Sequence, residues 1–169
     1  SGVAESRPIK GDSPEENTEL IQFSFTQFNR LLSAGGCCAC CCCGGGGPDP
    51  SFARWSLWMN KYIGFKSMVI WDKGPIGMGW HYRRSYETIL VGQKKGGKCR
   101  WYETTDKIEN IIRHIPKIIP KANQHPTIKP EALSAFFIRL HTKENDVVLD
   151  CFMGEGSTMR ATMKLHSRF

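Results

Sequence analysis

A glycine-rich turn follows an apolar run near the end of the chain, in the stretch VVLDCFMGEGST at residues 147–158. The run ends at Asp150, then come Gly154 and Gly156, and Ser157 opens a helical pattern. Glycine lets backbone approach a ligand closely, and the first N–H groups of a helix attract polar or anionic groups. Asp150 could accept a hydrogen bond from an amino or hydroxyl group. A single GxG is a weak signal, and an ordinary tight turn explains it equally well.

The segment HPTIKP, at residues 125–130, is the second candidate for chemistry. Lys129 comes just before an expected helix, whose first turn already favours negative charge. The hydroxyl of Thr127 and the ammonium of Lys129 could together hold a carboxylate. The alternative interpretation is a rigid connector bounded by prolines.

Positive charge is concentrated in the centre of the chain. The net charge is −3 over residues 1–50, +10 over residues 51–130 and zero over residues 131–169. A basic centre favours a polyanionic partner such as nucleic acid, and a solvated lysine-rich surface is the alternative. The side chains expected to contact phosphate are Arg83, Arg84, Lys94, Lys95, Lys98 and Arg100. Trp71, Trp80 and Tyr82 could stack on a base, although such aromatic residues are more often part of the core.

Six of the eight cysteines lie between Cys37 and Cys43. Alternate side chains of a strand point to opposite faces, so these thiols cannot converge on one ion. A disulfide framework would spread its cysteines along the chain. We therefore expect a buried strand with reduced thiols, no metal site, and a cytoplasmic setting.

Periodic apolar residues predict the elements that position these groups. We expect helices at residues 13–32, 51–64, 130–140 and 157–166, a short helix within 106–115, and strands at 37–43, 66–73, 85–92 and 146–150. Short apolar strands that alternate with helices indicate an α/β fold, a mostly parallel sheet with helices on both faces. No apolar stretch is long enough to span a bilayer, and the first residues do not form a signal peptide.

The order of the two candidate segments resembles the DNA methyltransferases that modify exocyclic amino groups of adenine or cytosine. The stretch HPTIKPEALSAFFIRLHTKENDVVLDCFMGEGST carries that resemblance, and upstream Trp71, Lys73 and Glu87 match a further family segment. The resemblance covers most of the chain from about Ser13. The segment order is similar to the permuted (beta-type) class, in which the cofactor turn comes last.

The resemblance implies a Rossmann-like methyltransferase fold and S-adenosylmethionine as cofactor. It implies double-stranded DNA as the partner, a homodimer as a candidate assembly, and the cytoplasm of a bacterial or phage-infected cell. It divides the chain into a first part of the core at 1–93, a variable basic segment at 94–123, and a cofactor segment at 124–169. The implied cofactor-binding residues are Thr127, Lys129, Asp150, Phe152, Gly154, Gly156 and Ser157.

One departure from the family is serious, because the 169 residues contain no aspartate-proline-proline-tyrosine segment. We therefore assign no catalytic residue, and we expect the chain to be the interior of a longer, incomplete methyltransferase fold without activity by itself. A non-catalytic cofactor- or DNA-binding module, a different nucleotide-using enzyme and a remnant that binds nothing are the alternatives. The same segment order serves adenine and cytosine, so the target base stays open.

Overall fold

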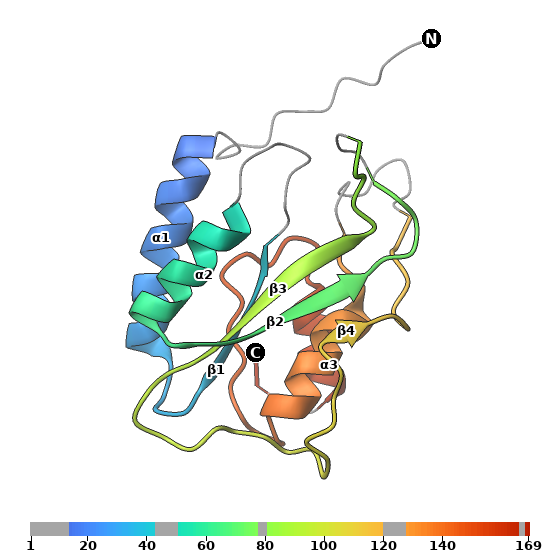
Figure 1. Ribbon diagram of the computed structural model, residues 1–169. Coiled ribbons are helices and arrows are strands. Elements are labelled where there is room, and N and C mark those ends of the chain that lie inside the picture. Colours follow the sequence, from blue (N-terminus) through green and yellow to red (C-terminus); the bar gives the residue numbers. More distant parts are fainter. Residues whose placement is uncertain (1–13, 43–50, 78–80, 120–127, 166–167) are drawn as a thin grey trace.

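A four-stranded sheet between helices organises the part of the chain that the computed structural model describes, which is residues 14–42, 51–77, 81–119, 128–165 and 168–169. In chain order the elements are α1 (Pro14–Leu31), β1 (Cys37–Cys42), α2 (Ser51–Tyr62), β2 (Phe65–Asp72), β3 (Tyr86–Gln93), β4 (Ile111–Ile112), α3 (Glu131–His141) and α4 (Ser157–Lys164). Figure 1 shows α1 and α2 on one side of the sheet and α3 on the other. The predicted α/β layering is confirmed.

The strand directions differ from the mostly parallel sheet that the sequence predicted. The order is β1-β3-β2-β4, and β3 runs antiparallel to both of its neighbours, β1 and β2. Only β4 pairs in parallel, with β2. Parallel neighbours need a long crossover, commonly a helix. The connection from β2 to β3 contains no helix in its described residues, and the chain folds back on itself.

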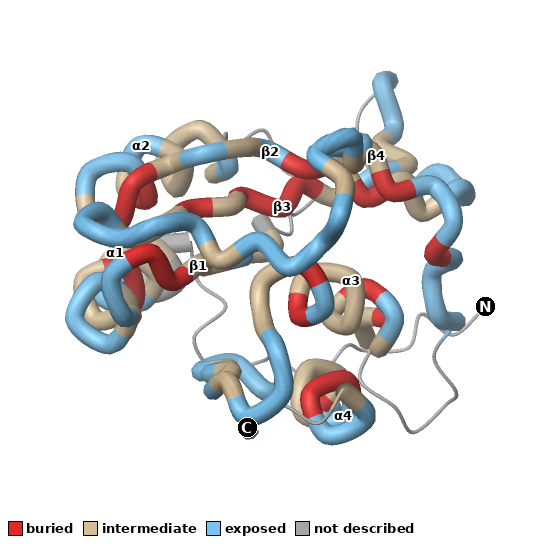
Figure 2. The backbone as a smooth tube through the Cα atoms, turned by 90° about the horizontal axis from the view of Figure 1, so that it is seen from below, coloured by how far each residue is buried: buried red, intermediate tan, exposed pale blue. Residues whose placement is uncertain are grey.

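The two faces of the sheet carry separate apolar cores because neighbouring strand residues point to opposite sides. On one face, Leu90 packs with Phe25 of α1 and Met59 of α2. On the other face, Ile89 packs with Trp71 and with Leu133 of α3. All six side chains are fully or almost fully buried. Figure 2 shows the buried positions concentrated along β3 and on the helix surfaces turned toward the sheet.

The cysteine-rich segment forms the predicted strand at one edge of this sheet. Cys38 and Cys40 face the core under α1 and α2, while Cys41 packs against the core under α3. The thiols of Cys37, Cys38, Cys40 and Cys41 are half-buried. The alternation that the sequence predicted for these side chains is therefore confirmed.

Two predicted elements are wrong. The helix expected within residues 106–115 is replaced by the short strand β4, where the β-branched Ile111 and Ile112 extend beside Ile70 and Trp71. The strand expected at 146–150 is reduced to one bridge, between Val147 and Arg168. A strand needs a partner along its length, and among the described residues this run pairs only at that point.

The segment at residues 94–123 is partly built into the core, since Ile112 and Ile115 pack against Trp71 and Leu133. The division at residues 93 and 123 stays a prediction. Among the described residues, none of the helices is both long and apolar enough to cross a membrane.

Candidate functional site

The turn between Asp150 and α4 adopts a conformation that suits glycine. Gly154 has φ +50° and Gly156, the residue before α4, has φ +74°. The N–H of Gly156 donates to the Met153 carbonyl at 2.8 Å, and the N–H of Phe152 donates to Asp150 Oδ1 at 2.9 Å. The predicted turn is therefore fixed by its own hydrogen bonds. The Asp150 carboxylate retains further lone pairs that can accept bonds from a ligand.

The same turn exposes large apolar side chains. Phe152 is 52% exposed and Met153 is 47% exposed. Ser157 is half-buried and begins α4, where the first backbone N–H groups have no partner within the helix. Apolar surface beside hydrogen-bonding groups is the composition typical of a small-molecule site.

Contacts between α3 and α4 join the two helices that follow the candidate segments. Ser134 Oγ, in the first half of α3, lies 3.3 Å from Thr158 Oγ1 at the start of α4. Glu131 pairs with Lys164 at 2.7 Å and with Arg160 at 3.6 Å. Sequence reasoning did not single out Glu131, although an acidic residue directly after Pro130 is typical of a first helical turn. These contacts pack α4, the helix after the glycine turn, against the first turns of α3, the helix after Lys129.

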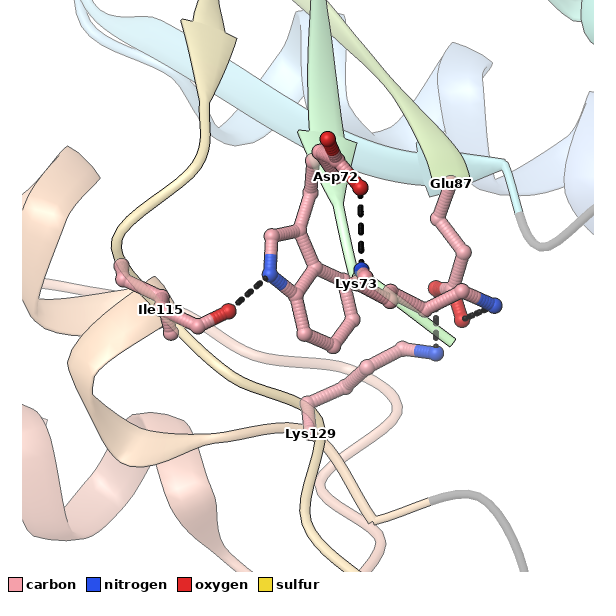
Figure 3. Close-up of polar contacts among 7 residues, drawn as sticks. Asp72, Lys73, Glu87, Ile115 and Lys129 are labelled. Atoms are coloured by element: carbon pink, nitrogen blue, oxygen red, sulfur yellow. Dashed lines mark hydrogen bonds and ion pairs between the residues drawn. The ribbon is translucent and has the colours of Figure 1, made fainter. Parts of the chain in front are cut away.

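Lys129 and Lys73 both point at Glu87, as Figure 3 shows. Lys129 Nζ lies 2.6 Å from Glu87 Oε2, and Lys73 Nζ lies 3.2 Å from Oε1. The Glu87 side chain is only 15% exposed. The Lys129 ammonium also lies 6.0 Å from the centre of the Trp71 ring. The ring is buried, and its Nε1–H donates to the Ile115 carbonyl at 2.7 Å. Trp71 is thus part of the core and not a base-stacking residue.

Two opposing effects act on the pKa of Glu87. Burial raises the pKa, but the hydrogen bonds and charges of Lys129 and Lys73 outweigh burial and bring it below its usual value. Glu87 is therefore ionised at neutral pH. The ammonium groups of Lys129 and Lys73 both pair with this carboxylate. Thr127, the predicted partner of Lys129, lies outside the described residues.

Comparison with known proteins identifies the family. A family model described as DNA methylase (N6_N4_Mtase) matches residues 8–169. The chain belongs to this DNA methylase family.

Individual members agree with that assignment. The chain is 33% identical over 122 residues to the Type II methyltransferase M2.DpnII of Streptococcus pneumoniae, over 63% of this chain and 46% of the relative. It is 30% identical over 102 residues to the Type II methyltransferase M.HhaII of Haemophilus parahaemolyticus, over 60% of this chain and 43% of the relative. The chain thus spans less than half the length of these two DNA methylases.

Solved DNA methylase structures have the same fold. The crystal structure of the M1.HpyAVI–SAM complex superimposes with a TM-score of 0.68 at 27% identity, covering 92% of this chain and 76% of that one. The cytosine-N4-specific PvuII DNA methyltransferase superimposes with a TM-score of 0.72 at 15% identity, covering 99% and 70% of the two chains. The second likeness concerns the fold alone.

The six cations predicted to contact DNA lie at two ends of β3. Arg83 and Arg84 precede β3, at the edge where Glu87 meets its two lysines, whereas Lys94, Lys95, Lys98 and Arg100 follow β3. An eight-residue strand separates the two sets by roughly 25 Å. The single basic face expected from the sequence is therefore divided in this DNA methylase.

Two cations of the second set have partners inside the protein. Lys94 Nζ donates to the carbonyls of Asn29 at 2.6 Å and Leu32 at 2.7 Å, and so caps the C-terminal end of α1. Arg100 pairs with Asp146 at 3.3 Å. Lys95 and Lys98 are exposed. Lys94 therefore has a structural role that its position in a lysine-rich loop did not indicate.

A shallow hollow at the end of β2 is a further feature that the sequence did not predict. It is lined by Asp72, Lys73, Gly74, Pro75, Arg113, His114 and Pro116. Arg113 is exposed and pairs with Glu109 on the surface at 2.7 Å. The hollow joins the loop after β2 to the chain after β4, and only the pairing of these two strands creates it.

Proposed function

We propose that this chain is part of a DNA methyltransferase that transfers a methyl group from S-adenosylmethionine to an exocyclic amino group of adenine or cytosine. The observation that carries the proposal is the turn from Asp150 to Ser157, with left-handed Gly154 and Gly156 before α4, in a chain that belongs to the DNA methylase family. The whole protein's activity is part of this proposal.

The residues of the turn fit the cofactor's chemistry. S-adenosylmethionine presents a flat base, ribose hydroxyls, and an amino acid part with an ammonium and a carboxylate. The exposed face of Phe152 can cover a flat ring, Asp150 can accept from an amino or hydroxyl group, and the N-terminus of α4 suits a polar group. Lys129 and Lys73 place two cations at one edge of the sheet, and the carboxylate is the part of the cofactor whose charge suits them.

The bound cofactor would supply an activated methyl group. The chain's own task would then be to hold the cofactor in a fixed orientation and to limit the access of water, because transfer requires the amino nitrogen in line with the methyl carbon. The target base has to leave the duplex to reach such a site.

Double-stranded DNA is the partner in this proposal. Arg83 and Arg84 are the favoured phosphate contacts because they lie at the edge of the sheet where β2 ends, and ligands of α/β proteins collect at such edges. Lys95, Lys98 and Arg100 belong to the basic segment at 94–123, which we propose as the variable DNA-recognition region. Lys94 is the weakest member of this set because its ammonium caps α1.

A cytoplasmic location and a homodimer complete the proposal. Cys37, Cys38, Cys99 and Cys151 form no disulfide, which is consistent with a reducing compartment. Exposed apolar side chains after α3, Val147 at 70% and Leu149 at 59%, leave surface that a second copy could cover. Light scattering of the purified chain measures its assembly state directly.

Calorimetric titration with S-adenosylmethionine tests the cofactor site. Asp150→Asn preserves an oxygen that can accept from the Phe152 N–H but removes the negative charge. We expect this variant to bind at least about tenfold more weakly, a loss of about 1.4 kcal/mol. Asp106→Asn, the same change at an exposed aspartate outside the turn, is the matched control and should bind like the original chain. Equal affinity in all three chains, or no binding by any of them, would contradict the proposal.

A further inference from the structure

Two thiols and one imidazole gather at the end of the sheet opposite Glu87. The sulfur atoms of Cys37 and Cys99 and one ring nitrogen of His141 all lie within 4.8 Å of one another. Cys37 begins β1 and pairs in register with Gln93, the last residue of β3. His141 is the last residue of α3, and Cys99 belongs to the loop after β3. The three side chains come from segments that are far apart in the sequence.

The backbone around this cluster is closely packed, which fixes where Cys99 can lie. A Cβ atom at Gly97 would approach the Ala34 carbonyl oxygen to 2.6 Å, closer than real Cβ atoms come. Gly35, at φ +78°, packs against the Lys98 carbonyl in the same way. The N–H of Gly35 also donates to the Lys94 carbonyl at 3.0 Å. These contacts hold the loop of Cys99 against the turn that leads into β1.

The hydrogen bond of His141 sets the ring in the form that binds metals. His141 Nδ1 lies 2.8 Å from the Arg100 carbonyl oxygen. A carbonyl can only accept, so Nδ1 carries the hydrogen and Nε2 retains the lone pair in the neutral ring. A backbone carbonyl that accepts from the second nitrogen is the usual support of a metal-binding histidine.

A divalent cation between the two thiols would bind them as thiolates, because metal binding deprotonates a coordinating thiol. The His141 ring also makes an edge contact with Trp101 at 5.5 Å, which shields one side of the cluster.

We propose that Cys37, Cys99 and His141 bind a divalent transition-metal ion, preferably Zn²⁺. Two thiolates and an imidazole match the ligands that zinc takes in proteins. Zinc–sulfur bonds of about 2.3 Å place tetrahedral ligands about 3.8 Å apart, so side chains within 4.8 Å need only small rotations. Cys99 is exposed, which leaves the fourth position to solvent. The ion would fasten the loop after β3 to β1 and α3.

The site lies at the opposite end of β3 from the ion pairs of Glu87, and its proposed role is structural. Cys37 pairs with Gln93, whereas Glu87 lies at the other end of the same strand. The alternative is a disulfide between Cys37 and Cys99. It would leave no thiolate to bind a metal ion together with His141.

Titration of the reduced chain with Co²⁺, in the absence of oxygen, tests the proposal. The charge-transfer absorption of thiolate-bound cobalt reports binding, and Zn²⁺ should displace it. The original chain should bind one equivalent of Co²⁺ at this site. We expect Cys99→Ser and His141→Asn each to weaken that binding at least about tenfold. The asparagine can still donate to the Arg100 carbonyl, which preserves the fold. Cys151→Ser removes one exposed thiol elsewhere and should bind cobalt like the original chain.

The His141 variant separates this site from binding by the other thiols of β1, which would not respond to loss of an imidazole. Circular dichroism confirms that each variant is folded. Cobalt binding that is unchanged in His141→Asn and Cys99→Ser would overturn the proposal. So would peptide mapping that finds Cys37 and Cys99 joined as a disulfide in chain isolated from zinc-supplemented cells.

Discussion

The ammonium of Lys129 lies 2.6 Å from a carboxylate oxygen of Glu87, although the two residues are 42 positions apart in the chain. This ion pair joins β3 to the segment before α3. Lys73, the residue after β2, pairs with the same carboxylate. A sheet strand, the following loop and the second candidate segment are thereby held at one edge of the sheet.

Glu87→Gln should lower the free energy of unfolding by about 3 kcal/mol, because it leaves two mostly buried ammonium groups without their carboxylate. Urea denaturation measures this change. Glu109→Gln is the matched control, since Glu109 pairs with Arg113 on the exposed surface. Glu109→Gln should lower the free energy of unfolding by less than about 1 kcal/mol. Equal losses of unfolding free energy in the two variants would show that the buried ion pairs stabilise the fold no more than the surface pair does.

The same carboxylate predicts how stability depends on pH. Because the pKa of Glu87 is lowered in the folded chain, its contribution is complete above its unfolded pKa. The contribution is lost as the pH falls from about 5 through the folded pKa. Denaturation curves at several pH values should show this acid loss in the original chain and a smaller one in Glu87→Gln. An identical acid profile in both chains would contradict the lowered pKa.

Gly156→Ala should weaken S-adenosylmethionine binding because the turn requires a positive φ at this position. Alanine in the left-handed region costs about 1 kcal/mol, which the turn can relieve only by changing shape. Gly96→Ala is the control: Gly96 also has a positive φ, and a Cβ there meets no atom within 4 Å. Both variants should lose similar stability, but only Gly156→Ala should lose cofactor affinity. If calorimetry finds that Gly156→Ala and Gly96→Ala bind S-adenosylmethionine equally well, the turn is not part of the cofactor site.

Replacing both Arg83 and Arg84 by glutamine should reduce the salt dependence of duplex binding. Each lost phosphate contact lowers the slope of log affinity against log salt by about 0.9. The matched double variant, Lys95→Gln with Lys98→Gln, probes the other end of β3 and reports whether that set also contacts DNA. Fluorescence anisotropy at several salt concentrations measures both slopes. If the arginine variant keeps the full slope, the arginines are not phosphate contacts.

Lys94→Met should destabilise the fold by about 1–2 kcal/mol, since its ammonium caps two carbonyls at the end of α1. Lys95→Met, an exposed neighbour, should change stability by less than about 0.5 kcal/mol. Thermal unfolding of the two variants makes the comparison. A loss of DNA binding by Lys94→Met without loss of stability would instead support the sequence-based prediction of a phosphate contact.

The local pattern of apolar residues was enough to predict most of the helices and strands. Helical spacing from Ile21 to Leu32 and the apolar run at Met68–Trp71 reflect forces that act within one element. The glycine turn was equally readable, because a positive φ at Gly154 and Gly156 is a property of single residues. The family resemblance rested on the same short segments.

Tertiary structure decided what depends on partners far along the chain. Within residues 106–115, Ile111 and Ile112 form a strand because they pair with β2. Among the described residues, 146–150 have too few partners to form one. The six cations predicted to contact DNA fall into two sets because β3 lies between them. Lys94 of the second set instead donates to a carbonyl at the end of α1. The sequence by itself determined the segments and their local conformations. The pairing of Lys129 with Glu87, and of Cys37 with Cys99 and His141, came only from packing, because no local pattern encodes which distant side chains meet.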